Sequence, residues 1–575
     1  MPVQRILIYA AALHPVLADM AVNPVRKHVW ILVAMPRVFI RCFKSCFGGL
    51  ALLALLAGSV NAAEVTVEQW GIFDISLSRP TNGNPFVDVQ FSARFSFVTS
   101  TVEVAGFYDG DGIYRVRFMP DRPGHWRYTT HSNRSELDAR TGEFTVSAPA
   151  VGNHGPVQVA NTYHFAYGDG TPFRPIGTTS YNWVHMADML EEQTLASLAA
   201  APFNKIRMCI FPKHNPESTN ELALFPFAGT PPKSWDFSRF DPRFFQHLEK
   251  RVGDLRDRGI EAELILFDPY DKGRWGFDRM PPEVDDRYVR YLASRLAAYR
   301  NVWWSLSNEY DFNKQKKESD WDRLFHALQA ADPYSHLRSI HNGFLIYNNS
   351  QPWVTHASIQ NGSAMEDAGR AELYRDVYRK PVVYDEVKYE GNIWKRWGNL
   401  SSEEMVFRFW QGTVAGTYVT HGEVVTNEQH ILWTSEGGKL CGQSPPRLAF
   451  LRQVLAESPV TGIDPIDKWQ DSNMGGKLGE YYLLYFGKQT PTSWPFELYK
   501  DRITNGMRFK VEILDTWDMT ITPVEGEFVT KKKDNYHFAD EKGRAVALPG
   551  KPYMALRIRR TLGPDAPPAM DGTPE

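Results

Sequence analysis

The hydrophobic pattern of the chain changes twice along its length. From Glu64 to about Pro149, short runs of alternating apolar and polar residues are separated by turn residues, and no helical period is present. The same alternation returns from about Thr461. Short strands at this spacing predict an antiparallel β-sandwich near each end of the chain. Such a module either binds carbohydrate or acts as a scaffold for the neighbouring domain.

Between these two regions, strand-like runs alternate with amphipathic helical stretches. The eight expected strands are Phe173–Thr178, Lys205–Phe211, Glu261–Phe267, Val302–Ser307, Leu337–His341, Val354–Ile359, Val382–Asp385 and Gly416–Thr420. The expected helices are Asp241–Gly259, Val284–Tyr299, Trp321–Ala331, Ala364–Tyr378, Glu403–Ala415 and Arg447–Glu457. This alternation favours an α/β fold of the (β/α)8 TIM-barrel type over an open doubly wound sheet. The absence of a G-x-G-x-x-G motif after the first strand agrees with this choice.

These patterns predict five segments. Residues 1–62 are expected to be an upstream extension plus a signal peptide, and residues 63–150 an N-terminal β-sandwich. Residues 151–460 are expected to form the catalytic barrel, and residues 461–562 a C-terminal β-sandwich. The Pro-rich, polar residues 563–575 are expected to be a disordered tail.

The N-terminal segment has the features of a secretion signal. Three basic residues between positions 37 and 44 precede the apolar run Phe47–Ala57, and cleavage is expected after Ala62. The apolar run is too short for a membrane-spanning helix. Either Met35 is the true start of the protein or the preceding residues form an unusual basic region. We therefore expect a bacterial protein that is secreted or periplasmic, with no membrane attachment after cleavage.

Composition narrows the classes of function. Hydrophobic residues make up 43% and charged residues 23% of the chain, which is normal for globular domains. A formal net charge of −3 and the lack of a Lys/Arg-rich run argue against nucleic acid as a partner. No His/Cys cluster has zinc spacing and no Gly-rich phosphate loop is present, so we expect neither a metal nor a cofactor. Beyond the signal, Cys209 and Cys441 either pair or stay free, and the oligomeric state is open.

Two of the expected strands end in carboxylates. The stretch NVWWSLSNEYDF is an apolar run that ends at Asn308 and Glu309, and KPVVYDEVKYEGN repeats this plan with Asp385 and Glu386. In a TIM barrel the carboxyl ends of the strands form the active site. Adjacent residues on a strand face opposite ways, so only one of Asp385 and Glu386 points into the mouth. We expect Glu386 to do so and Asp385 to be structural.

A pair of carboxyl groups at the mouth of a barrel is typical of glycoside hydrolysis. One group must stay protonated to donate to the leaving oxygen, and the other must be ionised to attack the anomeric carbon. Glu309 follows an aromatic-rich strand and suits the acid/base, because apolar surroundings raise a carboxyl pKa. Glu386 suits the nucleophile, and Arg207 is the candidate to keep it ionised. Carboxyl groups about 5–5.5 Å apart indicate retention of configuration, and about 6.5–9.5 Å indicates inversion.

Other polar residues follow the expected strands and are candidates for contact with a sugar. These substrate-binding candidates are Asn182, Trp183, Arg207, His214, Asp268, Asn308, His341, His356, Tyr389, His421 and Glu423. Each histidine is equally compatible with a structural role, and Glu390 and Glu423 are reserve carboxylates. The long loops Phe211–Trp235 and Phe267–Arg279 are rich in aromatic and Pro residues and are expected to set sugar specificity.

Several motifs carry a family resemblance. They are WGIFDISL, FYDGDGIYRVRFMPDRPGHW, SNE at the end of the fourth strand, DE-x-x-YEGN, THGE and LWTSEGGKLCGQSPPR. The chain resembles bacterial proteins that join a DUF5060 β-sandwich, a DUF4038-like barrel and a DUF5605-type β-sandwich, and its strand ends look like those of the clan A (4/7) retaining glycoside hydrolases. The resemblance implies that Glu309 is the acid/base, Glu386 the nucleophile and Asn308 a contact to the sugar 2-hydroxyl. The residue after the sixth strand that supports the nucleophile in many clan members is not evident.

The function expected from the sequence is therefore a secreted glycoside hydrolase that cleaves a poly- or oligosaccharide with retention of configuration. One alternative is a non-catalytic carbohydrate-binding or surface protein on a barrel scaffold, because a fold does not fix a function. Another is a transglycosidase or lyase that uses the same site. The sequence does not fix the sugar, its linkage or the choice between exo and endo action.

Overall fold

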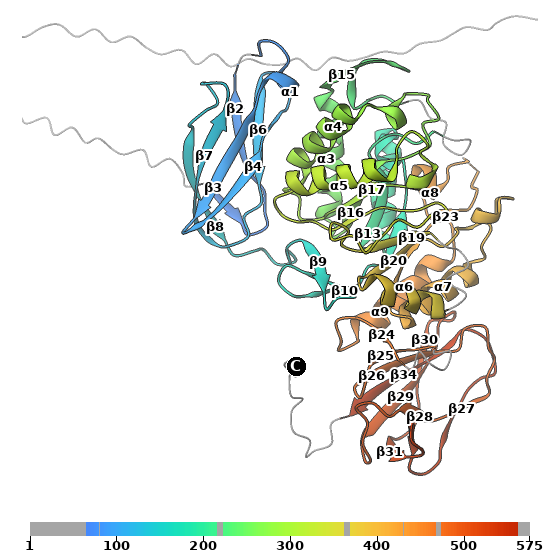
Figure 1. The fold of residues 1–575 in the computed structure, drawn as a ribbon. Coiled ribbons are helices and arrows are strands. Elements are labelled where there is room, and N and C mark those ends of the chain that lie inside the picture. The colour runs from blue at the N-terminus through green and yellow to red at the C-terminus, as the bar shows by residue number, and fades with distance from the viewer. Residues whose placement is uncertain are drawn as a thin grey trace, which may run out of the picture. The chain divides into compact units, whose positions relative to one another are not determined.

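The computed structural model describes residues 65–79, 81–214, 222–360, 368–428, 430–466 and 473–561. The expected signal segment and the expected disordered tail lie outside these residues. No helix within the described ranges is long and apolar enough to cross a membrane. The described chain forms a mixed α/β domain with antiparallel sheet regions on its N-terminal and C-terminal sides in the sequence (Figure 1), which confirms the predicted fold class.

The N-terminal region consists of two β-sheets and a short helix, α1 (Pro85–Asp88). One sheet has the order β1 (Thr66–Glu68), β8 (Thr141–Ser147), β7 (Gly124–Ser132), β3 (Phe91–Phe97) and β4 (Ser100–Ala105). The other has the order β2 (Phe73–Ser78), β6 (Ile113–Phe118) and β5 (Phe107–Tyr108). All pairs are antiparallel except β1 with β8. Stacked rings fill the core, with Phe73 against Phe144 and Phe95 against Phe118.

The C-terminal region is again antiparallel. Its strands are β24 (Asp464–Pro465), β25 (Met474–Lys477), β26 (Tyr481–Tyr485), β27 (Ser493–Pro495), β28 (Glu497–Tyr499), β29 (Arg508–Asp515), β30 (Thr520–Pro523), β31 (Phe528–Lys532), β32 (His537–Asp540), β33 (Ala545–Ala547) and β34 (Met554–Thr561). The first half of β29 alternates between exposed and buried residues, because successive side chains point to opposite faces of a sheet, whereas β26 is buried throughout. The sequence predicts this alternation correctly.

The central domain is a nearly closed barrel of eight parallel strands. In hydrogen-bonded order they are β18 (Arg338–Ser339), β17 (Val302–Ser307), β16 (Glu261–Phe267), β13 (Lys205–Cys209), β12 (Gly177–Thr179), β22 (Tyr418–His421), β20 (Val382–Glu386) and β19 (Ala357–Gln360). A parallel bridge between His341 and Ser358 joins the two ends of this sheet. Because the strands are parallel, their carboxyl ends meet at one rim.

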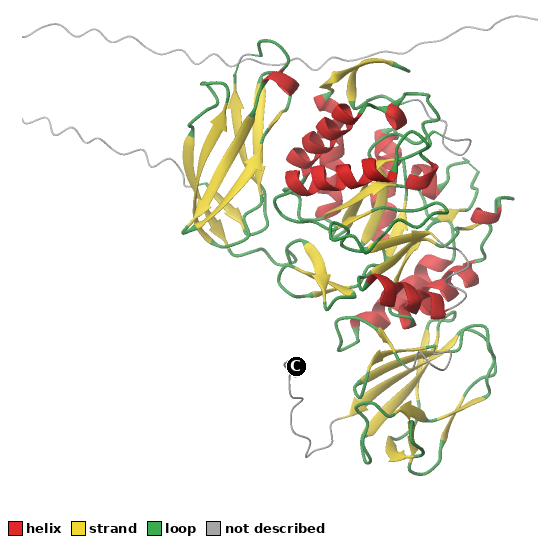
Figure 2. Cartoon of the chain, in the orientation of Figure 1, coloured by secondary structure: helices red, strands yellow, loops and turns green. Residues whose placement is uncertain are grey.

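Helices pack around the parallel strands (Figure 2). They are α2 (Asp188–Ala200), α3 (Pro242–Arg256), α4 (Pro282–Leu296), α5 (Glu318–Ala331), α6 (Ala368–Tyr378), α7 (Ser402–Val414), α8 (Trp433–Glu436) and α9 (Ser444–Ala456). Smaller elements are the pair β14 (Phe227–Thr230) and β15 (Ser234–Phe240), the pair β21 (Glu390–Gly391) and β23 (Glu423–Val424), and the 3-10 helices η1 (Trp183–His185), η2 (Phe277–Arg279), η3 (Tyr310–Phe312) and η5 (Arg396–Gly398). Helix α3 begins as its sequence predicts, because the Asp241 side chain accepts a hydrogen bond from Arg243 N and Pro242 is the first helical residue. The prediction lacks α2, and the described stretch between β18 and β19 contains no helix.

The first expected barrel strand begins too early. Phe173 belongs to β11 (Pro172–Phe173), which forms a small antiparallel sheet with β10 (His164–Tyr167) and β9 (Val157–Ala160). This sheet covers the amino-terminal end of the barrel, where Phe165 packs against Trp303 with ring centroids 5.0 Å apart. The barrel strand itself starts at Gly177, since Pro175 interrupts the apolar run before it.

Charged side chains fill the centre of the barrel. Lys205 and Arg207, two residues apart on β13, face the same side of that strand, and Glu263 on β16 and Asp385 on β20 meet them. Lys205 pairs with Glu263 and lies 2.8 Å from Asp385 Oδ1, while Arg207 Nε lies 3.2 Å from Glu263 and 3.7 Å from Asp385. All four residues, which we call the interior quartet, are fully buried. Its two positive and two negative charges cancel.

Replacing Lys205 by Met is expected to lower the free energy of unfolding by about 3–5 kcal/mol, because it leaves two buried carboxylates with one cation. Urea denaturation followed by circular dichroism measures this change. The matched control is Lys250→Met, which removes a solvent-exposed pair with Asp254 and is expected to change the free energy by less than about 1 kcal/mol. Equal effects of the two substitutions would contradict a central role for the quartet.

Candidate active site

The two predicted catalytic carboxylates lie at the carboxyl-terminal rim of the barrel. Glu386 is the last residue of β20, and Glu309 is the second residue after β17. Both residues are 8% exposed, so their carboxyl groups sit in surroundings with little water. Both sequence predictions therefore fall at strand ends of the same barrel.

Glu309 occupies a backbone conformation that is rare for a residue with a side chain. Its φ of 39° and ψ of 53° lie in the left-handed region, which favours glycine. The turn is fixed by hydrogen bonds, from Phe312 N to Glu309 O at 2.9 Å and from Tyr310 N to His341 O at 3.0 Å. Such a conformation costs on the order of 1–3 kcal/mol and persists where the surrounding structure determines it. The fold thus holds Glu309 in a fixed place at the rim.

Hydrogen-bond donors and positive charge surround Glu386. The Tyr181 hydroxyl donates to its carboxylate, His341 Nε2 lies 3.5 Å away and a guanidinium nitrogen of Arg207 lies 3.6 Å away. The Tyr389 hydroxyl is 2.9 Å from that of Tyr181. Burial raises the pKa of Glu386, but His341, Arg207 and Tyr181 outweigh burial and hold that pKa well below its usual range.

Glu309 has the opposite electrostatic environment. Burial raises the pKa of its carboxyl group, and the negative charge of Glu386 raises that pKa further. Lys213 and a hydrogen bond with Gln360 oppose this shift but do not cancel it. Glu309 is therefore favoured in its protonated form and Glu386 in its ionised form. Two groups with such divergent pKa values can divide the roles of acid and base between them.

Arg207 also orients the amide next to Glu309. The Asn308 side-chain oxygen accepts a hydrogen bond from Arg207 at 2.9 Å, and the Asn308 amide nitrogen donates to the Tyr270 hydroxyl at 3.3 Å. The ammonium of Lys213 lies over the rings of Tyr181 and Tyr270, 3.8 and 3.9 Å from their centroids. These contacts place Asn308 beside the carboxylates.

Several predicted contact residues hold the neighbouring loops in place. Asn182 exchanges hydrogen bonds of 2.7 and 2.9 Å with the backbone of Lys213. Asp268 accepts a hydrogen bond from Tyr270 N at 2.9 Å, and burial raises its pKa well above the usual range. His214 packs edge-on against Trp275 with ring centroids 5.9 Å apart. The structure thus groups these residues near the rim.

Four residues that the sequence predicts as sugar contacts have buried side chains that contact other parts of the protein, and their role as contacts stays a prediction. Trp183 is fully buried and donates to the sulfur of Met208, since η1 turns it inward. His356 precedes β19 and lies at the amino-terminal end of the barrel against Trp303. His421 and Glu423 are covered by the chain that follows β23 and face Glu390. The expected strand ends locate these residues along the chain but do not give the direction of their side chains.

Four rim residues are absent from the predicted contact set. They are Tyr181, Lys213, Tyr270 and Gln360. Tyr181 contacts Glu386, and Lys213 lies over the rings of Tyr181 and Tyr270. Tyr270 contacts Asn308, and Gln360 contacts His341. Each lies at a strand end or within a few residues of one, which is the signal that identified Asn308. Tyr181 and His341 fill the supporting position beside Glu386 that the sequence leaves open. Cys209 is buried and Cys441 is exposed, and both are free thiols.

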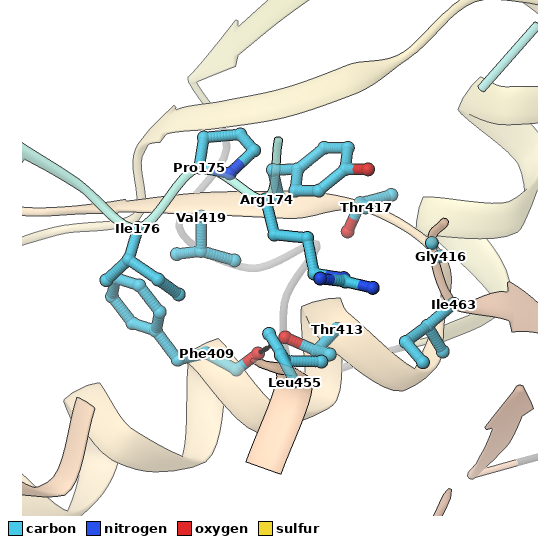
Figure 3. A pocket seen from close by; sticks show the side chains of 12 residues that line it. Arg174, Pro175, Ile176, Phe409, Thr413, Gly416, Thr417, Val419, Leu455 and Ile463 are labelled. Carbon is cyan, nitrogen blue, oxygen red and sulfur yellow. Dashed lines mark hydrogen bonds between the residues drawn. The ribbon is translucent and has the colours of Figure 1, made fainter. Parts of the chain in front are cut away.

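A small cavity lies at the opposite end of the barrel strands (Figure 3). It is lined by residues that precede β12 and β22, among them Arg174 and Thr417, and by the ends of α7 and α9. Its volume of about 20 Å³ is room for about one water molecule. No carboxylate lines it, so it does not offer the chemistry of the rim.

Three family models match successive parts of the chain. A domain of unknown function, DUF5060, matches residues 66–133, an apiosidase-like catalytic domain matches residues 159–424, and a second domain of unknown function, DUF5605, matches residues 469–559. The catalytic-domain match contains Glu309 and Glu386. A comparison with curated proteins found no match.

Solved structures include a protein from Bacteroides vulgatus ATCC 8482 described as a "putative glycoside hydrolase". It is 42% identical, the match covers 87% of this chain and 100% of that chain, and the TM-score is 0.84. A glycoside hydrolase family 5 protein from the same organism is 14% identical over 71% of this chain and 94% of that chain, with a TM-score of 0.53, and shares the fold. The chain therefore belongs to the family that joins DUF5060, apiosidase-like and DUF5605 domains, and it is a glycoside hydrolase with a carbohydrate substrate.

Proposed function

We propose that this enzyme hydrolyses a glycosidic bond of an oligo- or polysaccharide with retention of configuration, with Glu386 as the nucleophile and Glu309 as the general acid/base. The observation that carries the assignment of the two roles is the opposite shift of the two pKa values, upward for Glu309 and downward for Glu386. At neutral pH these shifts give the protonation states with which double displacement begins. Retention of configuration is inferred from the resemblance of the strand ends at Asn308-Glu309 and Glu386 to those of the clan A (4/7) retaining glycoside hydrolases.

In the first step the Glu386 carboxylate attacks the anomeric carbon, the bond to the leaving oxygen breaks and Glu309 gives its proton to that oxygen. In the second step Glu309 accepts a proton from water, the water oxygen attacks the same carbon, and the Glu386 carboxylate is released. The charge of Glu386 raises the pKa of Glu309. Formation of the glycosyl ester removes this charge and lowers the pKa of Glu309, so the carboxylate that remains after the proton transfer stays ionised and can act as the base.

The neighbours of Glu386 support this cycle. Tyr181 and Arg207 stabilise the carboxylate before the attack and when it leaves. Arg207 and Tyr270 fix the side-chain amide of Asn308. This amide is therefore pre-organised to contact a sugar hydroxyl next to the anomeric carbon.

Two tryptophans extend the site outward from Tyr389. Trp397 packs edge-on against the Tyr389 ring with centroids 5.7 Å apart, and Trp394, three residues earlier, is 88% exposed. Exposed rings of this size suit the apolar faces of sugars. A panel of oligo- and polysaccharides tested as substrates should include apiosides, because the catalytic-domain match is described as apiosidase-like.

Separate alanine substitutions of the two carboxylates test their roles. On an aryl glycoside with a good leaving group, Glu386→Ala with azide is expected to give a glycosyl azide of inverted configuration, because azide replaces the nucleophile. Glu309→Ala with azide is expected to give the retained product, because the ester still forms and azide replaces the activated water. On a natural substrate, loss of Glu309 should lower the rate by roughly 10²–10⁴-fold.

The matched control for this experiment is Glu428→Gln, an exposed glutamate on the chain that follows β23. Its product pattern and rate should equal those of the unmodified enzyme. Interchanged azide products would contradict the assignment of the two roles. An inverted sugar from the unmodified enzyme or an unsaturated product would contradict retaining hydrolysis. Transfer to a sugar acceptor with no hydrolysis would identify a transglycosidase instead.

Tyr181→Phe tests the cause of the low pKa of Glu386. The hydroxyl stabilises the ionised form, so its removal should raise this pKa and move the acid limb of the kcat/KM profile upward by about one to two pH units. Activity at acidic pH should then fall most. Tyr288→Phe is the matched control, because that buried hydroxyl donates to the backbone of Leu266 and touches neither carboxylate. An unmoved acid limb would contradict the role of Tyr181.

We also propose that the enzyme acts outside the cytoplasm of a bacterium, supported by the basic and apolar segments before Ala62. Expression of the full chain in a bacterial host should give a periplasmic or secreted protein whose N-terminal sequence starts at Ala63. A full-length protein retained in the cytoplasm would contradict this proposal.

A further inference from the structure

A second cluster of ionisable side chains is buried behind the rim. Glu390 on β21 and Glu423 on β23 are direct partners in a parallel strand pair, and His421 is the last residue of β22. The three residues are 2%, 1% and 0% exposed, respectively. His421 Nε2 lies 3.8 Å from Glu390 Oε2 and 4.0 Å from Glu423 Oε2. One ligand atom from each residue lies within 4.8 Å of the other two.

The charges of this cluster do not balance by themselves. Like charges directly opposite each other destabilise a strand pair, and burial increases the cost of each charge. Among the residues that the structure describes, His421 is the only basic side chain that pairs with Glu390 or Glu423. A divalent cation between the two carboxylates would neutralise both.

Two of the three atoms that face one another in this cluster have no hydrogen-bond partner, whereas Oε2 of Glu390 accepts from Ser444. Nε2 of His421 and Oε2 of Glu423 are buried and form no hydrogen bond. A hydrogen bond between an imidazole and a carboxylate has a length of about 2.7–3.2 Å, which is shorter than both observed separations. Two ligands of a tetrahedral zinc ion, each about 2.0–2.1 Å from the metal, lie roughly 3.3 Å apart. Nε2 of His421 therefore lies only about half an ångström farther from each carboxylate than two ligands of one zinc ion lie from each other.

We propose that Glu390, His421 and Glu423 bind one divalent transition-metal ion, zinc or manganese. An imidazole nitrogen with two carboxylates suits these metals, whereas calcium and magnesium prefer oxygen ligands alone. The sequence alone does not predict this site, because Glu390 lies far along the chain from the other two residues and no Cys/His spacing typical of a metal site is present.

Other groups hold the ligands in place, as is usual around a bound metal. Nδ1 of His421 lies 3.0 Å from the Thr178 hydroxyl, which leaves Nε2 facing the carboxylates. Oε1 of Glu423 accepts a hydrogen bond from Cys441 N at 2.6 Å. The carboxylate of Glu390 accepts hydrogen bonds at the start of α9. The ligand atoms are therefore positioned before any ion binds.

The proposed ion would link β21 and β23, and Tyr389 directly precedes β21. Glu390 N donates to Gly422 O at 2.9 Å, so the chain between the ligands His421 and Glu423 contacts the segment after Tyr389. Gly422 lies so close to the Tyr389 ring that a Cβ atom there would be 2.1 Å from it. The proposed ion would thus fix Tyr389, whose hydroxyl contacts that of Tyr181 beside Glu386.

The test uses the full chain after dialysis against a chelator. Isothermal titration with Zn²⁺ and with Mn²⁺ is expected to show one ion per chain, and the melting temperature is expected to rise by several degrees with the ion. Glu423→Gln and His421→Asn should each weaken binding at least tenfold. Glu497→Gln is the matched control, because Glu497, Asp534 and His537 form a similar but less buried cluster, and it should leave the affinity unchanged.

Three results would overturn the proposal. They are binding that survives both ligand substitutions, binding of Mg²⁺ or Ca²⁺ only, and no binding. Should either variant fail to fold, anomalous diffraction from crystals of the unmodified protein grown with Zn²⁺ decides the question. A peak between the three side chains supports the site, and peaks elsewhere alone overturn it. Metal binding is measured without substrate, so its outcome is independent of the roles proposed for Glu309 and Glu386.

Discussion

The active site depends on the charged interior quartet at the centre of the barrel. One guanidinium, that of Arg207, pairs with Glu263, contacts Asn308 and lies near Glu386, so it connects the ends of two strands, β17 and β20, to the interior. Burying four charges is unfavourable unless each has partners, which makes the arrangement highly specific. A slip of β13 by one residue would turn Lys205 and Arg207 outward, so the same interaction fixes the strand register.

The contrast between the two rim carboxyl groups follows from this arrangement. The charge of Arg207 is shared with Glu263 and Asp385, so it alone does not hold Glu386 ionised, and Tyr181 and His341 add hydrogen-bond donors. Glu309 lies on the other side of the barrel, in a buried turn where the charge of Glu386 is its main electrostatic neighbour. Both groups are glutamates, and their different surroundings shift their pKa values in opposite directions.

Continuous apolar runs made the barrel predictable from the sequence. Val302–Ser307, for example, is predicted with the bounds that the structure has, because its large apolar residues indicate a buried strand and the polar Asn308 and Glu309 follow directly. The quartet was not predicted, although Lys205 and Arg207 alternate with apolar residues in a way that places both on one face. Trp183 and His356 show the remaining limit, since position relative to a strand end does not determine where a side chain points. That direction depends on packing with residues distant in the sequence.

The barrel closes at its shortest strand, β18, and this bears on how the site loses its geometry. β18 has two residues, β19 has four, and in the described chain one bridge between His341 and Ser358 joins them. Segments with few backbone hydrogen bonds open locally at free energies below that of global unfolding. Opening this seam separates His341 from Ser358 and thereby releases a neighbour of Glu386. The position of His341 beside Glu386 therefore depends on this seam, and heating is expected to separate the two residues before the secondary structure is lost.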